Sequence, residues 1–181
     1  MNIRYCGLLL LFVIIGFTAC NDEDYFSSSS EFTLSFENDS IQLDTVFSNV
    51  PSSAKSFWIY NRSGAGIKCS NVRLDRGNQT GFRVNVDGIY LGKEVGYQTS
   101  DIEVRNGDSI RVYVEVTPPV NHQQDAKQVE DALLFTLESG KVQKVHLSVY
   151  SWDAIQLNQL HISSDTVIAS ERPIHVKNGI T

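Results

Sequence analysis

From Phe32 onward, hydrophobic and polar residues alternate with a period of two along most of the chain. The clearest run covers 110–116, where isoleucine and valine occupy every second position. Only an extended strand places successive side chains on opposite faces, so each such run can bury one face and expose the other. The other runs that follow this pattern are 32–36, 41–43, 57–60, 66–74, 81–86, 133–137 and 145–149.

Turn residues separate these runs at regular intervals. The segments that supply glycine, asparagine or aspartate for chain reversals are 61–66, 76–78, 87–88, 106–108 and 139–140. About seven to nine short strands joined by such turns predict an all-β fold, an antiparallel immunoglobulin-like β-sandwich. We expect 121–130 to be a loop rather than a helix, because Val129 is its only strongly apolar residue.

The N-terminus has a different pattern. Eleven almost wholly apolar residues, Gly7 to Phe17, follow the basic residue Arg4 and lead into Thr18-Ala19-Cys20. This run is shorter than the roughly 20 residues that a permanent membrane helix needs, so it predicts a cleaved secretory signal. A cysteine that happens to lie in an ordinary signal peptide is the alternative.

The cysteine after small residues resembles the lipobox of bacterial lipoproteins, with Phe17 in the place of the usual leucine. The resemblance implies cleavage before Cys20 and attachment of fatty acyl chains such as palmitate to this residue. Two or more acyl chains give stable membrane attachment, whereas one chain gives only reversible binding. The only membrane contact we expect is therefore this lipid anchor.

An acidic run, 21–24, follows Cys20 and resembles the signal that directs Bacteroidota lipoproteins to the cell surface. The alternative is the start of a solvated linker. We therefore expect a protein anchored by lipid in the outer membrane and exposed on the cell surface. The predicted organisation is a signal peptide at 1–19, a lipidated cysteine with a flexible acidic and serine-rich tether at 20–31, a sandwich at 32–150 and a C-terminal segment at 151–181.

Composition narrows the function further. The 181-residue chain has a formal net charge of −6, which argues against a nucleic-acid partner. Cys6 would be lost with the signal and Cys20 would be alkylated, which leaves Cys69 without an internal disulfide partner. The domain must then be stabilised by its apolar core. Cys69 lies in an alternating run, where we expect a buried, inert thiol rather than a nucleophile.

The segment 41–150 resembles the Hydin/ASPM-type immunoglobulin-like repeat. The similarity rests on Phe57-x-Ile59-x-Asn61, on Gly66-Ile67, Val72 and Gly81-Phe82-x-Val84, and on Ile102-x-Val104 followed by Asn106-Gly107-Asp108-Ser109-Ile110-x-Val112-x-Val114-x-Val116-Thr117-Pro118. Residues 88–100 form an insertion relative to this repeat. The resemblance implies a non-catalytic binding or spacer module.

The C-terminal motifs 162–167 and 173–176 resemble the start of a right-handed β-helix in large Bacteroidota surface proteins. In those proteins a lipobox and a Hydin-like domain precede the helix. The resemblance implies that this chain is the N-terminal remnant of a larger β-helix polysaccharide-active enzyme or adhesin. A short C-terminal hairpin or a frayed tail is the alternative.

No pattern of catalytic or metal-ligating residues stands out. Residues 83–94 match the spacing of an EF-hand loop in part, but Arg83 occupies the place of its first carboxylate. A strand followed by an Asp87-Gly88 turn explains this segment better. The four histidines lack the spacing of zinc ligands. We therefore expect no enzymatic activity, no cofactor and no metal.

The candidate ligand-binding residues are three aromatic side chains, Trp58, Tyr60 and Tyr113. If Phe57 and Ile59 pack inward, Trp58 and Tyr60 share the opposite face of their strand. Such a face suits stacking against a glycan or contact with a protein partner. The alternative is that these rings cover the outer face of a sheet or contact the next module.

Overall fold

The computed structural model describes residues 25–181. The predicted signal peptide at 1–19 and the predicted lipidation site at Cys20 lie outside the described residues. Within 25–181, no helix has the length and apolar character needed to cross a membrane.

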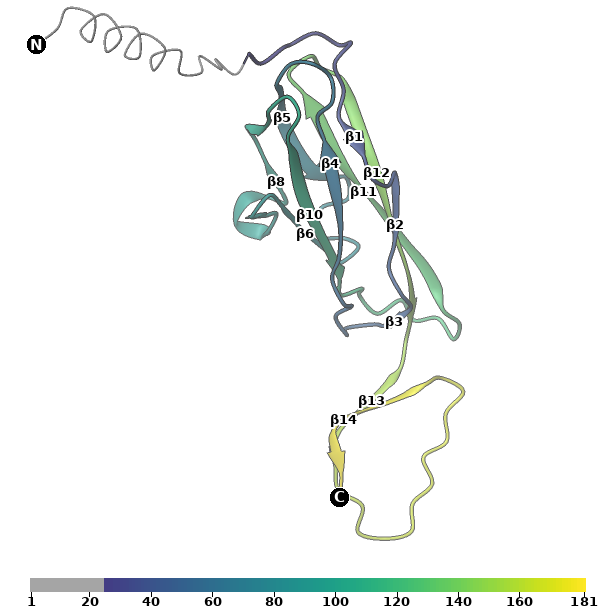
Figure 1. Cartoon of the computed structure of the whole chain (residues 1–181). Helices are drawn as coiled ribbons and strands as arrows, with labels where there is room; N and C mark the ends of the chain where they lie inside the picture. The colour runs from purple at the N-terminus through teal and green to yellow at the C-terminus, as the bar shows by residue number, and fades with distance from the viewer. Residues whose placement is uncertain (1–24) are drawn as a thin grey trace, which may run out of the picture.

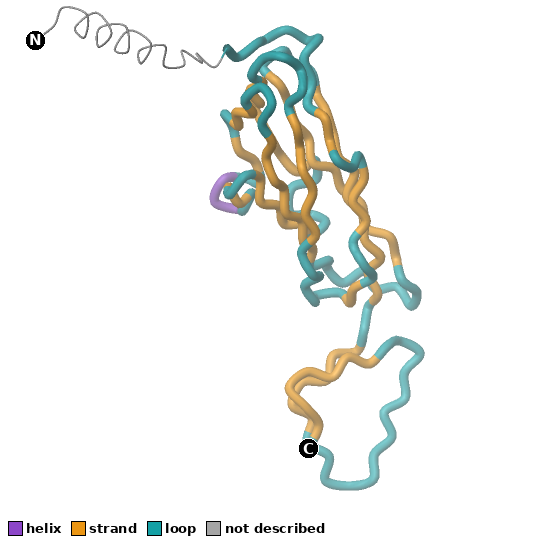
Figure 2. The backbone as a smooth tube through the Cα atoms, viewed as in Figure 1, coloured by secondary structure: helices purple, strands orange, loops and turns teal. Residues whose placement is uncertain are grey.

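Two β-sheets pack face to face (Figure 1). The first contains β1 (Ser35–Phe36), β4 (Lys55–Tyr60), β10 (Ser109–Val116), β6 (Phe82–Val86) and β7 (Ile89–Tyr90), in that spatial order. The second contains β2 (Ser40–Gln42), β12 (Val142–Trp152), β11 (Lys127–Leu137), β5 (Ile67–Leu74) and β8 (Gln98–Thr99). β3 (Val46–Phe47) also pairs with β12, and β9 (Ile102–Val104) with β5. The described part of the chain has one helical element, the short 3₁₀ helix η1 (Lys93–Val95), on the side of the sandwich (Figure 2).

The strand order is that of an immunoglobulin-like domain. The order β1-β4-β10-β6 corresponds to strands A, B, E and D of that fold, and β12-β11-β5 corresponds to G, F and C. The N-terminal segment changes sheets, because β1 pairs antiparallel with β4 and β2 then pairs parallel with β12. The predicted all-β, immunoglobulin-like sandwich is confirmed.

Alternation along the strands builds the core between the sheets. In β10, Val112, Val114 and Val116 are fully buried, while Arg111 and Tyr113, on the opposite face, are exposed. Burying one such apolar side chain stabilises a fold by about 1.5–3 kcal/mol. The largest fully buried side chains come from both sheets and include Phe57, Phe82, Phe135, Leu133 and Leu147.

The turn at Asp87-Gly88 joins β6 to β7. Both residues have positive φ, 50° and 86°, and Val86 pairs directly with Ile89. Two central residues with positive φ form a type I′ hairpin turn, which fits the twist of the flanking strands. The sequence interpretation of 83–88 as a strand followed by a turn is therefore confirmed.

The predicted loop at 121–130 is only partly correct. Its first part is a loop, but β11 begins at Lys127, and residues Lys127 to Glu130 pair with β12 from Ser151 to Ser148. Val129 is the only strongly apolar residue among these four, so the alternation of apolar and polar residues that predicts a strand is missing here. Pairing with a long neighbouring strand determines their conformation instead.

Asn61 is a buried polar residue at one end of the sandwich. Its Nδ2 donates hydrogen bonds to the carbonyl oxygens of Ala65 (2.7 Å) and Val104 (2.8 Å). Its Oδ1 accepts from the backbone N–H (3.1 Å) and the hydroxyl (2.7 Å) of Ser63. The side chain thus shapes the turn after β4 and joins it to β9.

The first described residues contact this same end. Gly66 donates its N–H to the carbonyl of Tyr25 (2.8 Å), and Ser27 donates its N–H to the carbonyl of Gly66 (2.9 Å). A Cβ on Gly66 would lie 2.8 Å from Cδ1 of Phe26, so glycine is needed for this close approach. The sequence places 25–31 in a flexible tether, whereas in the structure contact with the sandwich begins at Tyr25.

The C-terminal segment forms a separate two-stranded sheet. β13 (Ile155–Leu160) pairs in parallel with β14 (Ile174–Ile180), with Ile155 opposite Ile174. A wide loop connects the two strands at the end of the sandwich opposite the first described residues (Figure 1). A hairpin pairs its strands antiparallel, so the hairpin alternative for this segment is wrong.

Asp153 lies between the end of β12 and the start of the C-terminal sheet. The buried carboxylate accepts hydrogen bonds from the Ser48 hydroxyl and from the backbone N–H groups of Asn121 (3.1 Å) and His122 (2.6 Å). It therefore ties together the segment after β3, the loop before β11 and the end of β12.

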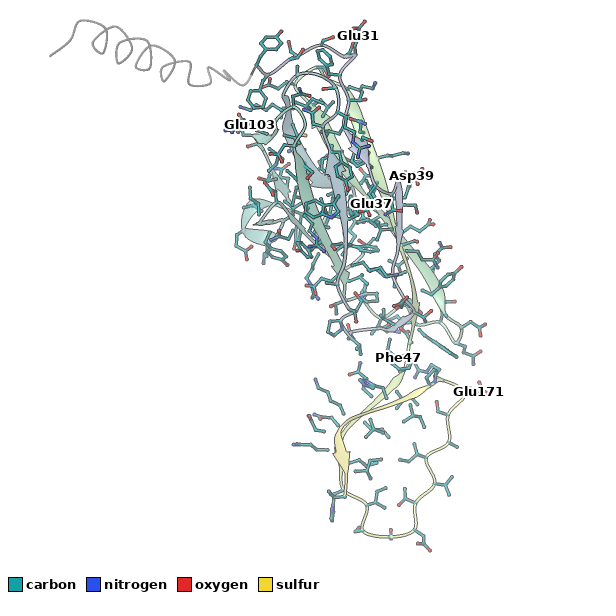
Figure 3. The ribbon with its side chains drawn as sticks, in the orientation of Figure 1. Glu31, Glu37, Asp39, Phe47, Glu103 and Glu171 are labelled. Carbon is teal, nitrogen blue, oxygen red and sulfur yellow. The ribbon has the colours of Figure 1, made fainter. Side chains whose placement is uncertain are left out.

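Side chains extend this junction into the C-terminal sheet. Phe47 and Glu171 lie where the two parts meet (Figure 3). The rings of Phe47 and His175 are 5.7 Å apart, and Nε2 of Gln124 donates to Oε2 of Glu171 at 2.8 Å.

The junction gives a prediction about pH. Burial alone would raise the pKa of Asp153, but hydrogen bonds from Ser48, Asn121 and His122 outweigh it and hold the pKa below its usual range. A lowered folded-state pKa means that the stabilisation is complete above the unfolded pKa of about 3.9 and is lost as the pH falls through the folded pKa. We expect Asp153→Asn to lower the free energy of unfolding at pH 7 by about 1–3 kcal/mol. The variant should also lose less further stability than wild type on acidification.

Urea unfolding at pH 7, 5 and 3 measures both effects. Asp165→Asn is the matched control, because Asp165 lies exposed in the wide loop and should change neither value. Equal stability losses on acidification in wild type and Asp153→Asn would refute the stabilising role of the ionised Asp153 carboxylate.

Candidate functional site

The candidate aromatic residues lie on the outer face of the first sheet. Phe57 and Ile59 of β4 are buried in the core, so Trp58 and Tyr60 project from the other face. Tyr113 of β10 projects from this same face and is 43% exposed. A side chain of this size left exposed on a regular sheet is available for contact with another molecule.

Arg111 lies between two of these rings. It pairs across the strands with Trp58, and its guanidinium carbon lies 5.2 Å from the centre of the Trp58 ring. The same carbon lies 5.0 Å from the centre of the Tyr113 ring. Such cation–π contacts hold the guanidinium in place over the sheet. We call Trp58, Arg111 and Tyr113 the aromatic–arginine stack.

The guanidinium of Arg111 has N–H donors left over for a ligand. It donates to the Ser56 hydroxyl from Nη2 (2.9 Å) and Nε (3.3 Å), and it has no carboxylate partner within 25–181. Arginine has five N–H donors and stays protonated, so donors remain for a hydroxyl or carboxylate of a ligand. Arg111 is not among the site residues expected from the sequence, although its place in the run 110–116 puts it on the same face as Tyr113.

Tyr60 belongs to one end of the same face. Arg62 lies over the Tyr60 ring at 4.6 Å, and Tyr60 pairs with Ser109, four residues before Tyr113. Tyr60 and Tyr113 are therefore separated by roughly 13 Å along the strand direction. The three predicted residues form a strip, with Tyr60 at one end and the aromatic–arginine stack extending to the other, rather than one compact patch.

The strip continues across the sheet to the insertion at 88–100. Asn85 of β6 pairs with Tyr113 on one side and with Tyr90 of β7 on the other. Tyr90 is 49% exposed and is the first aromatic residue that the insertion contributes. One cross-strand row thus leads from β4 through β10 and β6 to β7.

Cys69 is buried in the core and takes no part in this strip. Burial raises the pKa of its thiol to about 12, so the reactive thiolate is not populated at neutral pH. The predicted buried thiol is confirmed. Within 25–181, no group of three or more His, Cys, Asp and Glu side chains is arranged to hold a metal ion.

No protein-family model matches this sequence, and no curated protein matches it. Several solved structures show a distant similarity to the fold. VesB protease of Vibrio cholerae is 12% identical over 67% of this chain and 32% of its own, with a TM-score of 0.39. A family 123 glycoside hydrolase of Clostridium perfringens is 5% identical over 74% and 30%, with a TM-score of 0.44.

Another similar structure is the ASH/PapD-like domain 7 of human CEP192, which is 12% identical over 76% of this chain and 96% of that domain, with a TM-score of 0.38. The chain spans about a third of the length of the protease and the hydrolase. The matches to PapD-like domains concern the β-sandwich fold.

Proposed function

We propose that this chain is a non-catalytic, lipid-anchored protein of the outer membrane surface, whose sandwich serves as a binding or spacer module. The observation that carries the binding role is the aromatic–arginine stack of Trp58, Arg111 and Tyr113 on the outer face of the first sheet. The proposed partner is a glycan or a protein.

The stack has the properties of a binding surface. Its rings are held on two paired strands, so little conformational entropy is lost when a ligand packs against them. Aromatic faces stack on the apolar faces of sugar rings and on protein side chains, and the guanidinium adds directional hydrogen bonds. Tyrosine, tryptophan and arginine are the residues that contribute most often to binding energy at protein interfaces.

Sequence motifs support the assignment of the sandwich to the Hydin/ASPM-type immunoglobulin-like repeat. The valine-rich run 110–116 lies in β10, between β4 and β6 in the first sheet, and Asn61 shapes the turn after β4. The described chain begins at the end opposite the C-terminal sheet (Figure 1). An anchor at Cys20 would thus hold the N-terminal end near the membrane and direct the other end outward.

The binding role is tested by replacing Trp58 with alanine. We expect Trp58→Ala in the full chain to weaken binding to its best ligand on a glycan array by at least about tenfold. The thermal midpoint should stay within a few degrees of wild type, because Trp58 lies outside the core. Arg111→Ala should weaken binding similarly.

Tyr150→Ala is the matched control, because Tyr150 is a 39% exposed tyrosine on the second sheet. It should leave binding unchanged. Unfolding of Trp58→Ala would show that Trp58 is structural, and undiminished glycan binding by Trp58→Ala would contradict the proposed site.

The anchor is tested separately by Cys20→Ser. We expect this variant to lose metabolic labelling with palmitate and to leave the membrane fraction, because no thiol remains at position 20 for acylation. Cys6→Ser is the matched control and should keep both properties. A Cys20→Ser protein that stays in the membrane fraction with the mobility of wild type would refute the anchor.

A second candidate function is favoured by the parallel pairing of β13 and β14. Ile155 and Leu157 pair with Ile174 and Val176, so equivalent aliphatic residues recur after 19 positions and lie side by side. Stacked parallel strands with such a recurrence are the repeating unit of a parallel β-helix. The chain would then be the N-terminal part of a β-helix enzyme or adhesin that acts on polysaccharide.

If the second candidate function is correct, further coils of the β-helix should follow β14. We expect DNA that follows codon 181 to encode, in any frame, more segments with aliphatic residues at the same spacing. Sequencing this region measures it directly, and unrelated sequence in all three frames would exclude the second candidate.

A further inference from the structure

The insertion at 88–100 lines a surface cavity of about 280 Å³ at the edge of the first sheet. The insertion contributes Tyr90, Lys93, Glu94 and Tyr97, and η1 forms part of this wall. The rest of the lining comes from Asn78, Gly81, Phe82, Arg83 and Thr117. The cavity therefore joins segments that are far apart in the sequence.

Tyr97 is held in a conformation that bulky residues rarely adopt. Its φ is 61°, in the left-handed region. Two backbone hydrogen bonds hold it there: its N–H donates to the carbonyl of Gly92 (2.9 Å), and its carbonyl accepts from the N–H of Leu74 (3.2 Å). Such conformations persist only where the surrounding structure imposes them, and they concentrate at binding sites.

Two glycines allow close approach at the cavity: Gly81 in its lining and Gly92 in the neighbouring part of the insertion. A Cβ on Gly81 would lie 2.1 Å from the carbonyl oxygen of Thr117. A Cβ on Gly92 would lie 2.6 Å from Cε1 of Tyr90, so the tyrosine ring packs directly on the backbone of the insertion. These close contacts preform the cavity, which lowers the entropic cost of filling it.

The lining combines aromatic rings with balanced charge. Arg83 is neutralised by Glu115, with Nε and Oε1 2.8 Å apart. Lys93 and Glu94 contribute one charge of each sign, and Asn78 contributes an amide that both donates and accepts hydrogen bonds. Rings for stacking, amide and hydroxyl groups, and no net charge together suit an uncharged, polyhydroxylated ring.

We propose that this cavity binds one neutral sugar ring. Its volume is just below the 300–1,000 Å³ typical of sites for larger ligands, so it matches a single ring. Tyr90 lies at the end of the cross-strand row that contains Asn85 and Tyr113. The ring is either a free monosaccharide or the terminal unit of a glycan that continues along this row. The site depends on its own lining and does not require the aromatic–arginine stack.

Saturation-transfer NMR on the full chain in detergent tests the proposal. The neutral probes are the methyl glycosides of D-glucose, D-galactose and D-mannose, with N-acetyl-D-glucosamine, and the acidic probe is D-glucuronate. We expect transfer to at least one neutral probe and weaker transfer to D-glucuronate. Tyr90→Ala should weaken the affinity for that neutral probe by about tenfold, whereas Tyr150→Ala should not change it.

Further variants separate this site from the proposed function. Trp58→Ala should leave monosaccharide binding unchanged, and a loss of only oligosaccharide binding would identify the terminal unit of a glycan as the source. Tyr90→Phe keeps the stacking ring and should retain most of the affinity, which guards against misfolding of Tyr90→Ala. Absence of transfer to every neutral probe, stronger transfer to D-glucuronate, or unchanged binding by folded Tyr90→Ala would each overturn the proposal.

Discussion

The apolar interface between the two sheets is the constraint on which the rest of the structure depends. Cys69 is the one cysteine in 25–181, and it is a free, buried thiol, so no disulfide joins the sheets in this part of the chain. Valine, leucine, isoleucine and phenylalanine side chains from β4, β5, β10, β11 and β12 fill the interior. Because a close-packed interior resists deformation, the strands that form it also give the outer faces a fixed geometry.

Two buried polar residues hold the chain at the ends of the sandwich. Asn61 at one end bonds to the turn after β4 and to β9, and Asp153 at the other end bonds to the loop before β11. Such groups are costly to bury unless they are satisfied, so their full pairing explains why the adjoining loops adopt one conformation. The stack of Trp58, Arg111 and Tyr113 lies between these ends, on strands that the core already fixes.

The sequence predicts the strands and turns whose conformation depends on residues that are near in sequence. Alternation identified β4, β5, β6, β10, β11 and β12, because one buried face requires an apolar residue at every second position. The Asp87-Gly88 turn was predictable because few residues tolerate positive φ. Lys127 to Glu130 were missed, since their strand conformation comes from a neighbour distant in sequence. Arg111 and the cavity around Tyr90 and Tyr97 were missed for the same reason: cross-strand register and the folding of an insertion bring these residues together.

The change of sheet near the N-terminus has a mechanical consequence. β2 runs parallel to β12, and the described chain begins at one end of the sandwich and leaves it after β12 at the other end (Figure 1). Force that pulls these ends apart slides β2 along β12 and loads their hydrogen bonds together, instead of peeling them open one after another. Detachment of β2 under such a pull would therefore require all of these bonds to break at once.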